Sequence, residues 1–235
     1  MTWDWQVFLQ DPGGKDPTYW QWMLSAWGWT LSVALLALAI ALVVGSLMGI
    51  LRTAPNKWLM LLGNTWTEVF RNIPLLVQII LWYHVIPGLF TSLQQVPSFL
   101  LVVVALGFFT SARVSEQVKA GIQSLPRGQR YAGLAVGFTL PQTYRYVLLP
   151  MAFRIVLPPL TSESMNIVKN SSVAFAVSVT ELTMFAMQAQ EETSRGVEIY
   201  LAVTALYFVS AFAINRVMLF VEGRLQIPGH TAGGK

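Results

Sequence analysis

A long run of uncharged residues near the N-terminus restricts the fold more than any other feature of this sequence. No Asp, Glu, Lys or Arg occurs from Pro17 to Leu51. About 20 apolar residues in a helix are enough to cross the hydrocarbon core of a bilayer, so this run can hold one membrane span. Of the 235 residues, 54% are hydrophobic and only 11% are charged, whereas a soluble domain has about 25% charged residues. The sequence therefore predicts an all-α integral membrane protein.

Further apolar stretches predict five transmembrane helices in a single domain at 27–221. A leader at 1–26 is expected outside the membrane or at its interface, because six of the nine tryptophans precede residue 30 and Trp prefers the headgroup level. Residues 182–198 are predicted to form a loop, and a polar tail follows at 222–235. The expected spans lie at about 27–51, 58–86, 97–118, 151–179 and 199–221.

Lys and Arg residues are divided unevenly between the two sides of the membrane that five spans define. Cytoplasmic segments carry an excess of these residues, and the excess sets the orientation. One side holds only Lys15 and Arg195. We therefore predict that the N-terminus lies outside and that the C-terminus and the loop at about 119–150 are cytoplasmic. The basic residues on the other side are Arg52, Lys57, Arg113, Lys119, Arg127, Arg130, Arg145, Arg154, Arg216, Arg224 and Lys235.

The polar and basic stretch that contains this loop carries the signals of two short helices. Ser124-Leu-Pro and Thr139-Leu-Pro each place a capping hydroxyl before a Pro in the first turn. Gln142 follows Thr139 at the spacing of a capping box. Gly137 can end the first helix in the left-handed conformation, and Pro150 should end the second. Such a hairpin suits either docking on a partner protein or resting on anionic lipid headgroups.

The sequence holds no recognisable catalytic or nucleotide-binding motif. Walker A, His-Glu-x-x-His and nucleophile-elbow patterns are absent, and without Cys there is no thiolate metal site. The two histidines, His84 and His230, lie far apart in the chain. We therefore expect no enzyme activity and no bound cofactor, metal or nucleic acid. Any use of ATP would require a separate ATPase.

The first half of the second predicted span contains a pair of opposite charges. Glu68 and Arg71 are three residues apart, so they lie on one face of a helix. This spacing favours a structural ion pair, with a role as a gate as the alternative.

The fourth predicted span is unusually polar. An ionisable side chain near the middle of a membrane costs about 2.5–3.5 kcal/mol, so Glu163 and Lys169 should face protein or a water-filled path. They are six residues apart, and an unbroken helix would not pair them directly. Glu163, Asn166 and Asn170 share one helix face, with Lys169 one step around from it. These four residues form a candidate solute path, and structural pairs with neighbouring helices remain the alternative.

The spacing of the loop resembles the cytoplasmic signature of permeases in ATP-binding-cassette importers. That signature reads Glu-Ala-Ala, three residues, Gly, nine residues, Ile, one residue, Leu-Pro. Tyr131 stands in place of the Glu and Gly133 in place of the second Ala, which suggests that aromatic packing or a tyrosine hydroxyl replaces an ion pair at this corner. The resemblance implies that the loop docks in a groove of an ATPase subunit. The matching positions are Tyr131, Ala132, Gly133, Gly137, Val147, Leu149 and Pro150.

Two further motifs resemble the polar amino-acid branch of these permeases. They are FRNIPLLVQ at residues 70–78, and the Pro-Pro-Leu of residues 158–160 with Glu163 and Lys169. Relatives for cationic solutes often read Lys-Asp where this chain reads Lys169-Asn170, and the neutral amide removes a charge that would repel a dicarboxylate. Several other runs resemble one permease subunit of glutamate/aspartate uptake systems. Glutamine-, histidine- or arginine-type solutes are the alternatives.

This resemblance implies a multi-pass protein of the bacterial inner membrane that works with several partners. They would be ATPase subunits that use the ATP, a second permease subunit that is a different chain, and an extracytoplasmic solute-binding protein. Two other classes stay open. An ion-driven secondary transporter usually has an inverted repeat, of which we find no convincing example. A membrane enzyme would need a cluster of catalytic groups at one depth.

Overall fold

The computed structural model describes residues 3–14 and 16–225, and these residues form helices and no strand, as the sequence predicts. Lys15, His230, Lys235 and the predicted tail beyond residue 225 lie outside the described residues. The α-helices are α1 (Tyr19–Leu51), α2 (Lys57–Asn72), α3 (Leu75–Ile80), α4 (Ile86–Leu89), α5 (Ser98–Gln123), α6 (Arg127–Ala135), α7 (Leu140–Thr143), α8 (Leu149–Asn170), α9 (Leu182–Thr193) and α10 (Gly196–Leu225).

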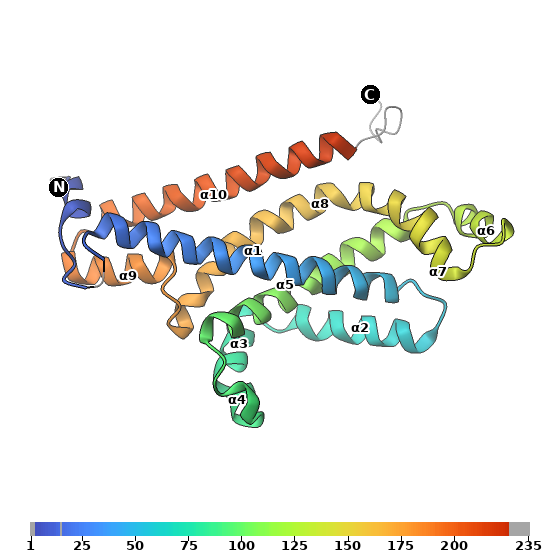
Figure 1. Ribbon diagram of the computed structural model, residues 1–235, viewed down its shortest axis with the longest axis horizontal. Coiled ribbons are helices and arrows are strands. Elements are labelled where there is room, and N and C mark those ends of the chain that lie inside the picture. The colour runs from blue at the N-terminus through green and yellow to red at the C-terminus, as the bar shows by residue number, and fades with distance from the viewer. Residues whose placement is uncertain (1–2, 15, 226–235) are drawn as a thin grey trace.

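The molecule is elongated, with α1, α5, α8 and α10 running along its long axis (Figure 1). The N-terminal leader and α9 lie at one end, and α6 and α7 lie at the other. We call these the leader end and the loop end. In the described residues, α1, α5 and α10 are each long and apolar enough to cross a membrane. Two bent helix pairs raise the number of candidate spans to five.

The first bent pair falls within the predicted second span. Helix α2 and residues 75–89 meet at 103°, because Ile73 adopts an extended conformation before Pro74. A residue that precedes Pro is disfavoured in the helical region. The Gln78 side chain spans the bend, where its Nε2 donates to the backbone carbonyls of Phe70 at 2.8 Å and Ile73 at 2.9 Å.

Helices α1 and α5 pack closely along a seam that two glycines of α1 make possible. A Cβ atom at Gly45 would lie 2.6 Å from the backbone oxygen of Ser111, and one at Gly49 would lie 2.7 Å from the Cβ of Val118. Both distances are too short for real atoms, so any larger residue would push the helices apart. The Gly-xxx-Gly pair thus allows the backbones to approach closely, as in membrane helix pairs generally.

The leader end contains a helix where the sequence analysis predicts a loop. Within residues 182–198, helix α9 covers Leu182–Thr193 and packs against α1 and α10, so the loop prediction is wrong. The buried Glu181 caps α9 by accepting N–H bonds from Thr183 at 2.9 Å and Met184 at 3.0 Å. The helical signal was present in the sequence, because the buried residues have helical spacing. They are Leu182, Phe185, Ala186 and Ala189.

The leader is folded against this helix. A short 3-10 helix, η1 (Trp5–Leu9), buries Val7 and Phe8 in a cluster with residues of α1, α9 and α10. The backbone N–H of Asp4 donates to Glu198 of α10 at 2.9 Å. The leader thus ties the first and last long helices together.

Candidate functional site

The turn between α6 and α7 has the geometry that its sequence predicts. Gly137 has φ +92°, and the N–H of Phe138 donates to the carbonyl of Gly133 at 3.2 Å. This is the Schellman pattern of a helix that ends in a left-handed glycine. Thr139 and Gln142 form the predicted capping box, in which the Thr139 N–H donates to Gln142 Oε1 at 2.8 Å. Both predictions are confirmed.

Two other predictions about the loop are wrong. Ser124 does not start α6, because it lies at the C-terminal end of α5 and its hydroxyl donates to the Gly121 carbonyl at 2.9 Å. Pro150 does not end the second helix, which continues without a break from α7 into α8. A π-helical turn, η4 (Tyr144–Leu148), lies just before Pro150. Such a turn shifts the hydrogen-bond register and lets the helix accept a residue that has no N–H.

Three of the signature residues of the loop, Ala132, Gly133 and Val147, line one hollow near the loop end of the molecule. Tyr131 is 67% exposed, and the corner between the two helices is closed instead by Thr143 against Gly133. A Cβ at Gly133 would lie 2.8 Å from the Cγ2 of Thr143, so the usual Ala would require the Thr143 side chain to shift. Leu149 and Pro150 lie in the first turn of α8. The hollow, of about 320 Å³, is lined by Gln129, Ala132, Gly133, Val136, Val147 and Met151.

A hydrogen-bonded tyrosine joins this loop to the membrane-spanning helices. The Tyr144 hydroxyl in η4 donates to the backbone carbonyl of Thr53 at 2.8 Å and lies 3.0 Å from its Oγ1. Thr53 lies in the turn between α1 and α2. Tyr144 is itself buried in a cluster with Val114 and Leu148. A displacement of α6 and α7 would therefore move the turn that joins α1 to α2.

The predicted pair of charges in the second span belongs to a larger network. Arg71 contacts Glu68 at 2.9 Å and Glu116 of α5 at 3.2 Å. Glu116 also pairs with Arg52 at 2.9 Å, and Arg52 donates further to Asn64 at 2.9 Å. The side chain of Arg52 is only 4% exposed. The network links α2 and α5 to the end of α1.

The polar residues of the fourth predicted span divide between the interior and the surface. Glu163 is buried on α8, Asn166 and Asn170 are half-buried, and Lys169 is exposed. Glu163 and Lys169 are not an ion pair in the structure. Glu163 pairs with Arg113 of α5, whose Nη1 lies 3.8 Å from Glu163 Oε2, and the side chains of Asn166 and Gln117 also interact with its carboxylate.

Arg113 is the residue of this site that sequence reasoning missed. The charge pattern groups it with the basic residues that set the orientation, yet it lies within α5, ten residues before the helix ends at Gln123. The signal was available, because an Arg inside an apolar helix is rare and marks a functional position by default.

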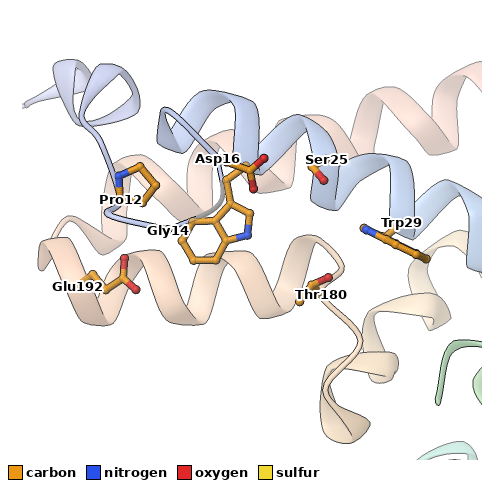
Figure 2. Close-up of a pocket in the computed structure, with 8 residues that line it drawn as sticks. Pro12, Gly14, Asp16, Ser25, Trp29, Thr180 and Glu192 are labelled. Atoms are coloured by element: carbon orange, nitrogen blue, oxygen red, sulfur yellow. The ribbon is translucent and has the colours of Figure 1, made fainter. Parts of the chain in front are cut away.

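A second cavity lies at the leader end (Figure 2). Its volume is about 380 Å³. Two carboxylates line it, and Glu192 accepts a hydrogen bond from the Tyr19 hydroxyl at 2.8 Å. Its acidic lining would repel an anionic solute. The lining residues are Pro12, Gly14, Asp16, Trp22, Ser25, Trp29, Thr180 and Glu192.

Comparison with known proteins identifies the family. Residues 41–227 match the model of the binding-protein-dependent transport system inner membrane component. The chain belongs to this family. It is 43% identical over 243 residues to the glutamate/aspartate import permease protein GltJ of Escherichia coli K12, with 99% of each chain covered. It is 32% identical over 198 residues to the glutamine transport system permease protein GlnP of the same strain, covering 84% of this chain and 90% of GlnP.

A solved structure agrees with this family membership. The crystal structure of an amino acid ABC transporter with histidines has a chain that is 31% identical to this one. The two superpose with a TM-score of 0.78 over 95% of this chain and 100% of the other. The binding-protein-dependent transport fold therefore extends over nearly the whole molecule.

Proposed function

We propose that this chain is the membrane-spanning permease subunit of an ATP-driven importer of polar amino acids, with glutamate and aspartate as its solutes. The observation that carries the proposal is the likeness to GltJ along the full length of both chains. Asn170 supports the choice of solute. Relatives for cationic solutes often have an Asp at this position, whereas here the residue after Lys169 carries no charge that would repel a dicarboxylate. In the described residues no group of three metal-ligating side chains occurs, and ATP would be used by a partner.

The proposed topology has five spans, with the leader outside and the loop end in the cytoplasm of a bacterial cell. The five are α1, the bent pair at 57–89, α5, the bent pair at 140–193 and α10. Basic residues support the direction, because Arg127, Arg130 and Arg145 all lie on the loop segment and cytoplasmic segments are rich in Arg and Lys.

The α6–α7 segment is the proposed docking element for the ATPase subunit. Its apolar side chains are exposed, with Val136 73% and Leu134 40% exposed. A partner groove that covers them would gain from burying this apolar surface. Gly137 fixes the angle between the two helices, and Tyr144 passes movement of the segment to the turn at Thr53. ATP-driven closure of the ATPases would thus tilt the spans together.

The solute path is proposed to follow the partly exposed side of α8. Asn166, Lys169 and Asn170 lie there, with Glu163 buried behind them. This chain encloses the path on one side only, so a second permease subunit, a different chain, would form the other side. An extracytoplasmic binding protein would deliver the solute at the leader end.

Competition measurements test the choice of solute. The complex would be reconstituted in proteoliposomes with its ATPase and binding protein, and uptake of labelled glutamate would be measured with a panel of unlabelled amino acids. We expect aspartate and glutamate to compete, and glutamine, histidine and arginine to leave uptake unchanged. Competition by one of those three, with aspartate without effect, would assign the permease to another solute.

A further inference from the structure

Arg113 lies beside the proposed solute path. It is ten residues from the end of α5, which corresponds to about 15 Å along the helix. Its partner Glu163 is on α8, the helix that carries Asn166 and Lys169. Arg113 is therefore next to the proposed path rather than in the cytoplasmic loop.

The guanidinium of Arg113 is held loosely. Its Nη1 lies 3.8 Å from Glu163 Oε2, which is longer than a hydrogen bond. The ring of Phe109 lies 5.3 Å below the guanidinium carbon and can fix its plane. The side chain remains 45% exposed, although that of Glu163 is only 11% exposed.

Arg52 is a structural arginine in the same protein and serves as a comparison for Arg113. It is 4% exposed and contacts Glu116 at 2.9 Å, Asn64 at 2.9 Å and Ser115 at 3.3 Å. Arg113 differs from Arg52 in exposure and in the length of its ion pair. An arginine presents five N–H donors in a fork that fits a carboxylate, and the exposed edge of Arg113 can offer such donors to a solute.

We propose that Arg113 binds the side-chain carboxylate of the acidic amino acid during passage, and that Glu163 holds the guanidinium when no solute is there. This proposal rests on the proposed function. Lys169 is six residues from Glu163, or about 9 Å further along α8, so a dicarboxylate moving along this side meets one cation and then the other.

Two neighbouring groups support this assignment. Gln117 is one turn from Arg113 on α5, and its Oε1 is buried without a hydrogen-bond partner among the described residues. The oxygen is enclosed in this conformation, so the Gln117 side chain must turn toward the path before it accepts a bond from the ammonium group of the solute. The carboxylate of Glu163 competes with the carboxylate of the solute for Arg113, so binding stays weak enough for release.

Three variants of the reconstituted complex test the proposal: Arg113→Gln, Glu163→Gln and the double variant. ATP-driven glutamate uptake should fall about ten-fold or more in Arg113→Gln, the scale of one lost charge-assisted hydrogen bond. Glu163→Gln should lower the KM for uptake by about two- to five-fold, because a competitor of the solute is removed. The double variant should stay as impaired as Arg113→Gln. Arg154→Gln, an exposed arginine of α8, is the matched control.

A purely structural ion pair would give another pattern. Each single variant would then be impaired because it leaves an unpaired charge, and the double variant would recover uptake. That recovery would overturn the proposal, as would normal uptake by Arg113→Gln. ATPase activity stimulated by the loaded binding protein shows whether each complex is assembled. If the wild-type complex takes up only a neutral amino acid, the proposed function fails instead, and the variants are not needed to show it.

Discussion

The α1–α5 seam and the α6–α7 segment use glycine for opposite purposes. In the seam, Gly45 and Gly49 remove side chains so that two apolar helices touch along their backbones. In the segment, Gly137 supplies a left-handed turn that holds two exposed helices at a fixed angle, and a Cβ there would meet no atom within 4 Å. The seam is a frame that should not move. Because the segment is the proposed docking element for the ATPase, we call it the lever.

Replacing Gly49 by Leu should break the frame and give the largest effect. The added side chain would overlap Val118 and the backbone of Ser115, and overpacking of this kind costs about 1–3 kcal/mol or more. We expect a lower yield and a melting temperature reduced by several degrees in the purified complex. Gly28→Leu on the same helix is the control, because a Cβ at Gly28 meets nothing within 4 Å. Equal stability of the two variants would contradict the close packing of α1 against α5 at the seam.

Replacing Gly137 by Val should damage the lever and leave the frame intact. A left-handed conformation costs an L-residue about 1–2 kcal/mol, so the angle between α6 and α7 would change. We expect a normal melting temperature of the permease, with loss of the co-purified ATPase and of ATP-driven uptake. Gly128→Val in α6 is the matched control, since it has open space around it and no positive φ. Normal coupling of ATP hydrolysis to uptake in Gly137→Val would exclude a role of the fixed α6–α7 angle in coupling.

Removing the hydroxyl of Tyr144 should weaken the connection between lever and frame. Tyr144→Phe loses the bond to the Thr53 carbonyl, worth about 1 kcal/mol. More ATP should then be hydrolysed for each glutamate taken up, in a complex that still assembles. Tyr146→Phe, on the same turn but 58% exposed, should leave this ratio unchanged. The ratio of ATP hydrolysed to solute transported is the measurement.

The smallest effect is expected at Glu68. Its pair with Arg71 is half-exposed on both sides, and exposed ion pairs contribute about 0–1 kcal/mol. Glu68→Gln should therefore change neither the melting temperature nor uptake by more than a small amount. A large loss of uptake at normal stability would instead favour the alternative that this pair gates the path.

The sequence predicted those features that depend on local chemistry. The spacing of Gly137 and the Thr139–Gln142 pair defined the loop because turn and cap residues act within a few positions. Likewise, the uncharged runs located the long helices. The position of Arg113 inside an apolar helix could be read from the sequence, but its contact with Glu163 depends on the packing of α5 on α8. The sequence does not reveal α9 clearly because polar residues alternate with the buried residues of its helical pattern. The effect of Pro150 is predicted wrongly because a π-helical turn before it lets the helix continue without the N–H that Pro lacks.

The proposed function requires that this permease transport solute only when a separate ATPase acts through the α6–α7 segment. It is tested most directly by uptake of labelled glutamate into proteoliposomes that contain the permease subunits, with and without the ATPase and ATP. We expect uptake only when binding protein, ATPase and ATP are all present, and we expect Gly137→Val to abolish it. Uptake by the permease without an ATPase, driven by an ion gradient, would contradict it.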